Sequence, residues 1–152
     1  MADYVLNEWV WGDLRGENGV EKQGETFKLL CVMLEKADRL VVVKGSAFDK
    51  KAWDLCGADD VLLRKMGAFY RGNFRFNSGA CIELNQAGLG GLPDVLADVE
   101  ARDRYLVQSL RAVAGSILIS TDRYLLAVVN RNGMNCQHRD EFVPVYLREA
   151  VV

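Results

Sequence analysis

The sequence has little of several features that mark common classes of function. It has a single histidine, and its four cysteines lie far apart without a C-x-x-C pair, so a zinc knuckle is not expected. No apolar stretch is as long as a membrane span, and the opening Met-Ala-Asp-Tyr does not resemble a secretory signal. The formal net charge of −2 argues against a uniformly basic, DNA-coating surface. We therefore expect a soluble, cytoplasmic protein with reduced, buried thiols and no membrane segment.

The apolar residues that are present alternate between two kinds of pattern. Short runs at 4–6, 39–43 and 117–119 are typical of strands covered on both faces. Between them, apolar residues recur at helical spacing, as in the segment 20–37. Strands that alternate with helices indicate parallel β-α-β units. The 152 residues are therefore predicted to form one three-layer α/β/α domain around a central, mostly parallel sheet.

The sequence also predicts the secondary structure of the remaining segments. A turn into a short helix is expected over 7–14, and further helices at about 48–56, 59–70, 102–114 and 122–129. The segment 72–91, rich in Asn and Gly, is predicted to be irregular. Its Gly88–Gly91 run lacks the lysine of a phosphate-binding loop. The segment 142–147, Phe-Val-Pro-Val-Tyr-Leu, is expected to be a last short strand or an extended tail.

Polar residues follow each of the three predicted strands. Asn7 and Glu8 follow the first, Ser46 lies just beyond the second, and Thr121 and Asp122 close the third. Ligand sites in open parallel sheets form outside the carboxyl ends of the strands. We therefore expect these side chains to gather at one edge, where Ser46 and Asp122 are also good helix N-caps.

Asp103 is expected to reach the same edge from a helix. It lies three residues before Leu106 and so extends the apolar stripe of that helix inward. Carboxylates that converge on one place repel each other at neutral pH, and oxygen ligands select Mg²⁺ or Mn²⁺. Such a site typically activates water and binds a phosphate oxygen. Taken alone, Asp103 and Asp122 could equally be helix caps.

Two segments resemble the PIN-domain (PilT N-terminus-like) ribonucleases. Asp103-Arg-Tyr-Leu-Val-Gln-Ser-Leu matches the family's aspartate that opens a helix, and Ile117-Leu-Ile-Ser-Thr-Asp122 matches its strand-closing Thr-Asp. The two aspartates are 19 residues apart, which suits the pattern. Ala52-Trp-Asp-Leu55 could stand for the acidic middle-helix element, with Asp54 in place of the usual Glu.

The resemblance implies metal-assisted hydrolysis of single-stranded RNA that leaves a 5′-phosphate. The implied metal ligands are Asp103, Asp122 and either Glu8 or Asn7. Asp54 would act with them in catalysis by orienting the attacking water. Ser120 or Thr121 would hydrogen-bond a ligand carboxylate or a phosphate. The family also implies RNA as a partner, with an antitoxin protein or a second copy of the chain as further candidates, the latter through the N-terminal tryptophans.

One departure from the family pattern leaves two functions open. The family usually ends its first strand on aspartate, whereas this chain has Asn7 followed by Glu8. An amide binds a divalent cation more weakly than a carboxylate, so the chain is either an active nuclease or a weakened PIN-like binding or scaffold module. A receiver-like or small-molecule-binding domain is a third reading, although a receiver site would need a lysine near a late strand end, and none is found.

Other residues carry competing interpretations. Asp54 could be a solvated surface residue, and Asp49 competes for its role. Basic residues at 64–75, interleaved with aromatic residues, could form an RNA-facing strip or merely a solvated helix face. His138 has no partner motif and is expected to be a surface or satisfied polar residue rather than a catalytic base.

Overall fold

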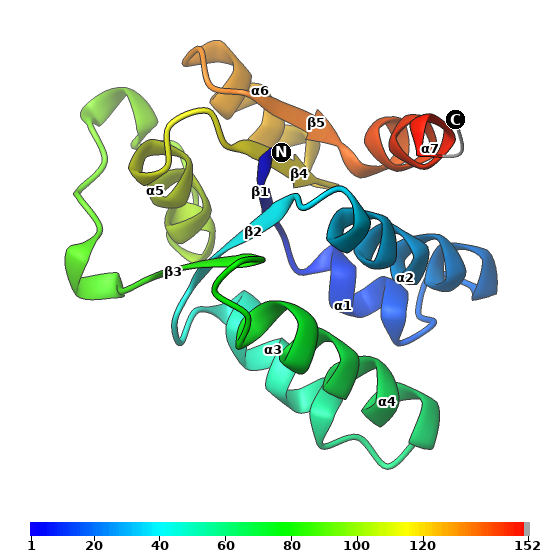
Figure 1. Cartoon of the computed structure of the whole chain (residues 1–152). Coiled ribbons are helices and arrows are strands. Elements are labelled where there is room, and N and C mark those ends of the chain that lie inside the picture. Colours follow the sequence, from blue (N-terminus) through cyan, green and yellow to red (C-terminus); the bar gives the residue numbers. More distant parts are fainter. Residues whose placement is uncertain (151–152) are drawn as a thin grey trace.

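Helices cover both faces of a single sheet in the computed structural model, which describes residues 1–150 (Figure 1). The sheet has the order β3-β2-β1-β4-β5, and every neighbouring pair of strands is parallel. This confirms the predicted three-layer α/β architecture. The strands are β1 (Asp3–Leu6), β2 (Arg39–Val43), β3 (Cys81–Leu84), β4 (Ile117–Ser120) and β5 (Cys136–His138). The helices are α1 (Trp9–Leu14), α2 (Val20–Glu35), α3 (Ala47–Cys56), α4 (Val61–Tyr70), α5 (Arg104–Ala112), α6 (Arg123–Arg131) and α7 (Arg139–Glu149).

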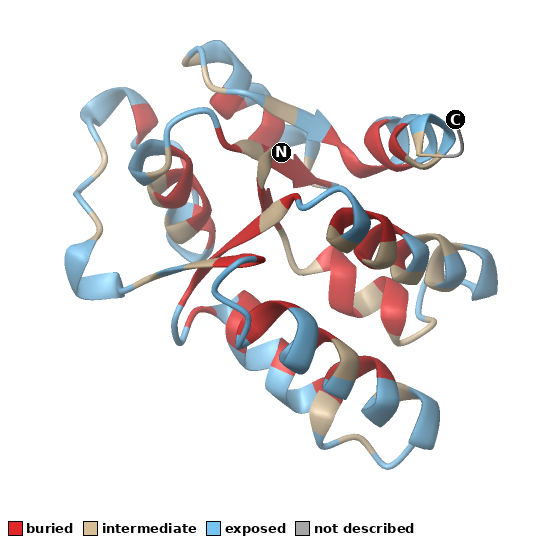
Figure 2. Ribbon diagram, in the orientation of Figure 1, coloured by how far each residue is buried: buried red, intermediate tan, exposed pale blue. Residues whose placement is uncertain are grey.

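The hydrophobic core has two parts, one on each face of the sheet. Successive side chains of a strand point to opposite faces, and accordingly Tyr4 and Leu6 of β1 enter one cluster while Val5 enters the other. The first cluster packs against α1, α2, α3, α4 and α7, and the second against α5 and α6. Buried residues follow the strands and the helix faces that meet them, whereas most of the segment between β3 and α5 is exposed (Figure 2).

Serine or aspartate side chains cap three of the helices as their sequence suggests. The Ser46 hydroxyl accepts from the Asp49 backbone N–H (3.3 Å), and carboxylates of Asp60 and Asp122 cap α4 and α6 in the same way. Asp103 occupies the N-cap position of α5 but makes no capping hydrogen bond. Its carboxylate is therefore free for another use.

The prediction for the last part of the chain was wrong. Residues 142–147 lie within α7 rather than in a strand. Their β-branched and aromatic composition favours a strand, and Pro144 argues against a helix interior. However, Phe142, Val143 and Tyr146 share a helical face that packs on the core near Tyr4. Burial of that face outweighs the backbone hydrogen bond that proline cannot donate.

Two short edge strands were missed. Cys81–Leu84 lies in the segment that was predicted to be irregular, and it pairs with β2 over four residues. Cys136–His138 pairs with β4. Both strands are only three or four residues long, and β3 is flanked by residues rich in Asn and Gly, so their own sequences carry little strand signal.

The structure also bears on the expectations about membrane segments, cysteines and the N-terminal tryptophans. No helix among residues 1–150 is long and apolar enough to cross a membrane. All four cysteines are free, with Cys81 buried and the others half-buried. Trp9 and Trp11 are buried in the core, so the suggestion that they form a dimer interface was wrong.

Candidate active site

A small hollow opens beyond the carboxyl ends of β1 and β4. Its volume is about 240 Å³. Its walls bring together the four predicted metal ligands with two neighbouring polar residues and Trp9: Asn7, Glu8, Trp9, Arg102, Asp103, Thr121 and Asp122. We call it the acidic hollow. The location agrees with the rule that sites form where parallel strands end.

A hydrogen-bond network joins the ends of β1 and β4 at this hollow. Leu6 pairs with Ile119, which places Asn7 beside Ser120. Asn7 Nδ2 donates to Ser120 Oγ (3.2 Å), and that oxygen also accepts from the Asp122 backbone N–H (3.1 Å). Asn7 Oδ1 accepts from the Glu8 backbone N–H (2.7 Å). Asn7 and Ser120 therefore fix the strand ends that carry Glu8 and Asp122.

Asp103 is the most deeply placed carboxylate of the acidic hollow. The residue is only 9% exposed. Burial raises the pKa of its carboxyl group, and the charges of Asp122 and Glu8 raise it further, while Arg102 lowers it. The ionised Asp103 carboxylate is therefore opposed by its burial and by the acidic side chains of Asp122, Glu100 and Glu8. Arg102 Nε lies 3.9 Å from Asp103 Oδ2 and 2.9 Å from Glu100 Oε2.

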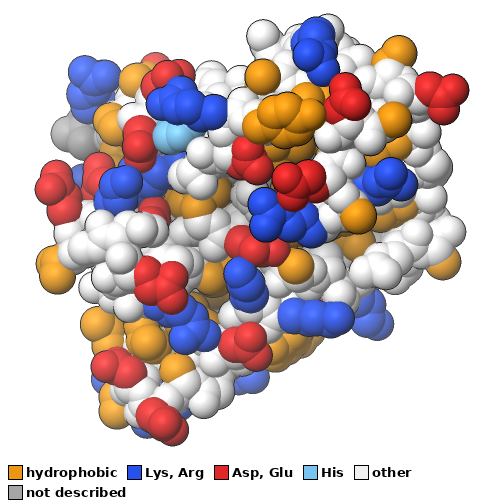
Figure 3. Space-filling model, turned by 180° about the vertical axis from the view of Figure 1, so that it is seen from behind, with side chains coloured by type: hydrophobic (Ala, Val, Ile, Leu, Met, Phe, Trp, Pro, Cys, Tyr) orange, Lys and Arg blue, Asp and Glu red, His pale blue; other side chains and the backbone are white. Residues whose placement is uncertain are grey.

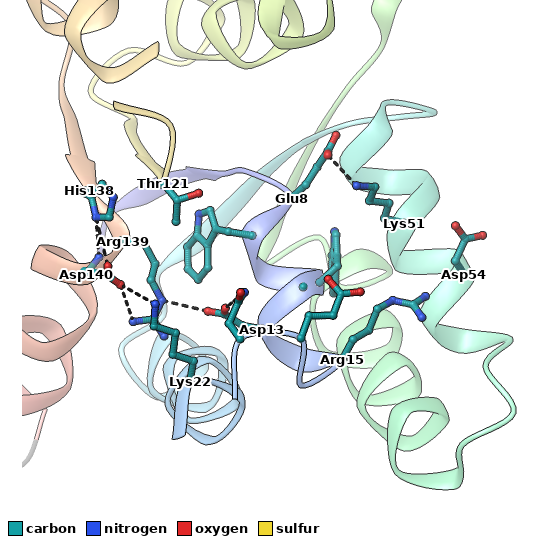
Figure 4. A pocket seen from close by; sticks show the side chains of 15 residues that line it. Glu8, Asp13, Arg15, Lys22, Lys51, Asp54, Thr121, His138, Arg139 and Asp140 are labelled. Atoms are coloured by element: carbon teal, nitrogen blue, oxygen red, sulfur yellow. Dashed lines mark hydrogen bonds and ion pairs between the residues drawn. The ribbon is translucent and has the colours of Figure 1, made fainter. Parts of the chain in front are cut away.

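Glu8 is engaged by a cation from the middle helix. Lys51 Nζ on α3 lies 2.8 Å from Glu8 Oε2, and Figure 4 shows the two side chains pointing toward each other. Asp54, one turn later on α3, is exposed and does not line the acidic hollow. Ser46 also lies outside it, at the start of α3. The structure thus brings Asp103 together with the strand-end residues. Ser46 lies elsewhere, and Asp54 shares only an adjoining hollow with Glu8 and Thr121.

A larger hollow of about 550 Å³ adjoins the acidic hollow and shares Glu8, Trp9 and Thr121 with it. Its floor holds a buried ion pair in which Arg139 Nε lies 3.0 Å from Asp13 Oδ2 (Figure 4). Acidic and basic side chains both line it, and Lys22 and Arg139 each pair with Asp140. We call it the mixed-charge hollow.

His138 is a satisfied polar residue at the wall of the mixed-charge hollow, as expected. It is buried, and its Nδ1 accepts from the Asp140 backbone N–H (3.0 Å), which caps α7. That ring nitrogen is therefore not available as a general base.

Only part of the suggested RNA-facing strip over residues 64–75 lies at the surface, where Arg64, Lys65 and Arg71 are exposed. Arg75 is buried, and its Nε lies 2.8 Å from Asp49 Oδ1. Tyr70 and Phe74 are buried as well. Asp49 also accepts from the Gly45 backbone N–H (2.9 Å), so it anchors the first turn of α3 instead of lining a site.

The donor set fits a sparse cation site rather than a closed cage. No group of three or more His, Cys, Asp or Glu side chains within residues 1–150 is arranged to hold a metal ion. Asp103 and Asp122 remain as two carboxylates on one hollow without an ion-pair partner closer than 3.9 Å. Mg²⁺ is often held by only one or two protein carboxylates, with waters and substrate phosphates as its other ligands.

Sequence reasoning missed Lys51, because the spacing of charges along α3 does not reveal which of them faces Glu8. A search against models of known protein families found none that matches this chain, and a search of curated proteins found no significant match. The structural observations support an α/β fold with five parallel strands and an acidic hollow at the carboxyl edge of its sheet.

Proposed function

We propose that this chain is a PIN-like, metal-dependent ribonuclease that hydrolyses phosphodiester bonds of single-stranded RNA. The observation that carries the proposal is the meeting of Asp103, Asp122 and Glu8, from three distant segments, around one hollow. Carboxylates that share a partly buried hollow repel one another, and a divalent cation relieves that repulsion. The parallel fold is compatible with the resemblance of residues 103–110 and 117–122 to the family's motifs.

Asp103 and Asp122 are the proposed ligands of one Mg²⁺ or Mn²⁺ ion. A cation bound there would activate water and polarise a phosphate oxygen. Glu8 is available as a third carboxylate when it leaves Lys51, and that ion pair is largely solvent-exposed, so breaking it costs little. Thr121 is exposed at the rim and offers a hydroxyl to a phosphate. Asp54 has no role in this arrangement.

The test is cleavage of a labelled, unstructured oligoribonucleotide in EDTA, Mg²⁺ and Mn²⁺. We expect cleavage only with metal, 5′-phosphate products, and loss of activity in the double variant Asp103→Asn/Asp122→Asn. The matched control is Asp94→Asn, an exposed aspartate outside the hollows, which should retain activity. Cleavage that persists in EDTA or in the double variant would refute the proposal.

A second candidate function is a PIN-like module that binds without cleaving. It is favoured by Asn7 at the position where the family has aspartate and by the cation that Lys51 places on Glu8. This module would bind no Mn²⁺ and cleave no RNA under any condition. Calorimetric titration with Mn²⁺ separates the two candidates.

A protein partner, either an antitoxin or a second copy of the chain, is also proposed rather than shown. Since Trp9 and Trp11 are buried, such a partner would need other apolar contacts. Exposed apolar side chains are available on α3, α4 and the turn after α4, namely Trp53, Val61, Leu62 and Phe76. Light scattering of the purified chain tests self-association directly.

A further inference from the structure

A third hollow, between the start of α3 and the start of α5, differs from the other two in its charge. Its volume is about 490 Å³. Three of its lining side chains are cationic, from Lys50, Arg102 and Arg104, and none is acidic. We call it the cationic hollow. Over the face of the molecule that Figure 3 shows, by contrast, acidic and basic side chains intermix.

Two of the three cations have no partner of opposite charge. Within residues 1–150, Lys50 and Arg104 make no ion pair, although both are exposed. By contrast, the lysines of the mixed-charge hollow, Lys22 and Lys51, each lie within 3.5 Å of a carboxylate. Unpaired cations that share a concave, acid-free surface create a positive potential that favours an anion.

The backbone of α3 adds to this potential. Ser46 and Ala47, at the N-terminus of this ten-residue helix, line the cationic hollow. Helix N-termini carry partial positive charge and favour anions. Asp49, the acidic residue of the first turn, does not line the hollow and is neutralised from the other side by Arg75.

The cationic hollow adjoins the proposed active site. Arg102 lines both hollows, and the next residue is the buried Asp103 of the acidic hollow. Arg102 pairs only with the exposed side chain of Glu100 at close range, and its own side chain is 74% exposed. A chain of phosphates could therefore follow the protein surface from one hollow to the other.

We propose that the cationic hollow binds a backbone phosphate of the RNA strand, adjacent to the phosphate that is cleaved. Lys50 and Arg104 contact this phosphate, and Arg102 separates it from the acidic hollow. The proposal rests on the proposed function for its choice of ligand. Binding itself needs no metal, so it can be measured separately from cleavage.

The experiment measures binding of a fluorescein-labelled, single-stranded oligoribonucleotide by anisotropy in EDTA, over a series of salt concentrations. We compare the wild type with Lys50→Gln/Arg104→Gln and with a control of equal charge, Lys28→Gln/Arg111→Gln. Both control residues are exposed and line none of the three hollows, and Arg111 is on the same helix as Arg104. Thermal unfolding checks that all three proteins fold alike.

The variant of the cationic hollow, Lys50→Gln/Arg104→Gln, should bind RNA more weakly than the control variant. Its RNA affinity should also depend less steeply on salt concentration. The slope of log K against log salt should fall by about 0.7 for each phosphate contact that is lost. Equal slopes and affinities in the two double variants would overturn the inference. If RNA binding depends on the cationic hollow but no metal supports cleavage, the inference stands and the nuclease proposal fails.

Competition distinguishes a phosphate in a strand from a free one. Unlabelled oligoadenylate, adenosine 5′-monophosphate and inorganic phosphate are each titrated against the labelled RNA. A large preference for the oligonucleotide that is lost in Lys50→Gln/Arg104→Gln supports the proposal. Equal competition by the mononucleotide or by inorganic phosphate assigns the hollow to a small ligand and overturns it.

Discussion

Lys51 Nζ on α3 and Glu8 Oε2 at the end of β1 lie 2.8 Å apart, so the middle helix supplies a cation beside the acidic hollow. The family resemblance implies a carboxylate from this helix instead. The pair is partly exposed, with side chains 52% and 33% accessible, and contributes little to folding stability. The pair orients the Glu8 carboxylate, and it would compete with the proposed metal ion for that carboxylate.

Removing this cation should strengthen metal binding. In Lys51→Gln, Glu8 loses its counterion and is free to face the acidic hollow. A unit charge about 4 Å away in water is worth about 1 kcal/mol, so Mn²⁺ affinity should rise about fivefold. Calorimetric titration measures it, with Lys28→Gln as the control of equal charge. Unchanged or weaker Mn²⁺ binding would show that Glu8 is not a ligand.

Restoring the family's aspartate should have a larger effect. Asn7→Asp keeps the shape of the side chain and its acceptor for the Glu8 N–H, and Ser120 Oγ can donate where it now accepts. The added carboxylate should tighten Mn²⁺ binding by at least about tenfold and increase the rate of RNA cleavage. Asn135→Asp, an exposed change elsewhere, is the control. Affinity that stays at the wild-type level would place position 7 outside the metal site.

Neutralising Asp103 should stabilise the metal-free protein at neutral pH. Its folded-state pKa is raised above the ordinary value of 3.8, chiefly by burial. Protonated Asp103 therefore favours folding below that value, and this contribution is lost as the pH rises through the folded-state pKa. Asp103→Asn should have a higher Tm than the wild type in EDTA at neutral pH, and the difference should shrink toward pH 3.8. A lower Tm at neutral pH would mean that the ionised carboxylate has an unrecognised favourable contact.

The buried ion pair beneath the mixed-charge hollow should be important for stability. Asp13 and Arg139 have side chains only 2% and 3% accessible, and Asp13 also accepts from Thr26 Oγ1 (2.8 Å). Asp13→Asn leaves the guanidinium buried without its closest carboxylate, which should cost about 3 kcal/mol. Tm should fall by about 10 °C, whereas Asp94→Asn should hardly change it. Equal Tm values would contradict the assignment of this pair as a structural anchor.

The sequence predicts the centre of the sheet better than its edges. β1, β2 and β4 are buried on both faces and consist of apolar runs, so their composition alone identifies them. The edge strands β3 and β5 form because their backbones pair in register with a neighbouring strand. The types of residue in these two short strands give no signal of that pairing. The helix α7 was misjudged because tertiary burial overrides local propensity.

The candidate site was predictable to a similar, partial extent. The strand-end rule places Asn7, Glu8 and Asp122 together, and helical periodicity brings Asp103 to them. Periodicity also puts Lys50 and Lys51 on α3, but the direction of each side chain depends on how that helix is rotated on the sheet. That rotation is set by tertiary contacts such as the Asp49–Arg75 pair, which no local pattern encodes.

The adjacent residues Lys50 and Lys51 couple the position of α3 to two different hollows. Successive helical residues point about 100° apart, and Lys50 lines the cationic hollow while Lys51 pairs with Glu8 beside the acidic one. The helix cannot turn or slide without disturbing both. It is held at its first turn by Asp49 and crossed closely by α4, where a methyl group on Gly67 would come within 2.8 Å of the Cys56 backbone nitrogen. A perturbation of the α3–α4 hairpin far from either hollow would therefore alter the environment of both together.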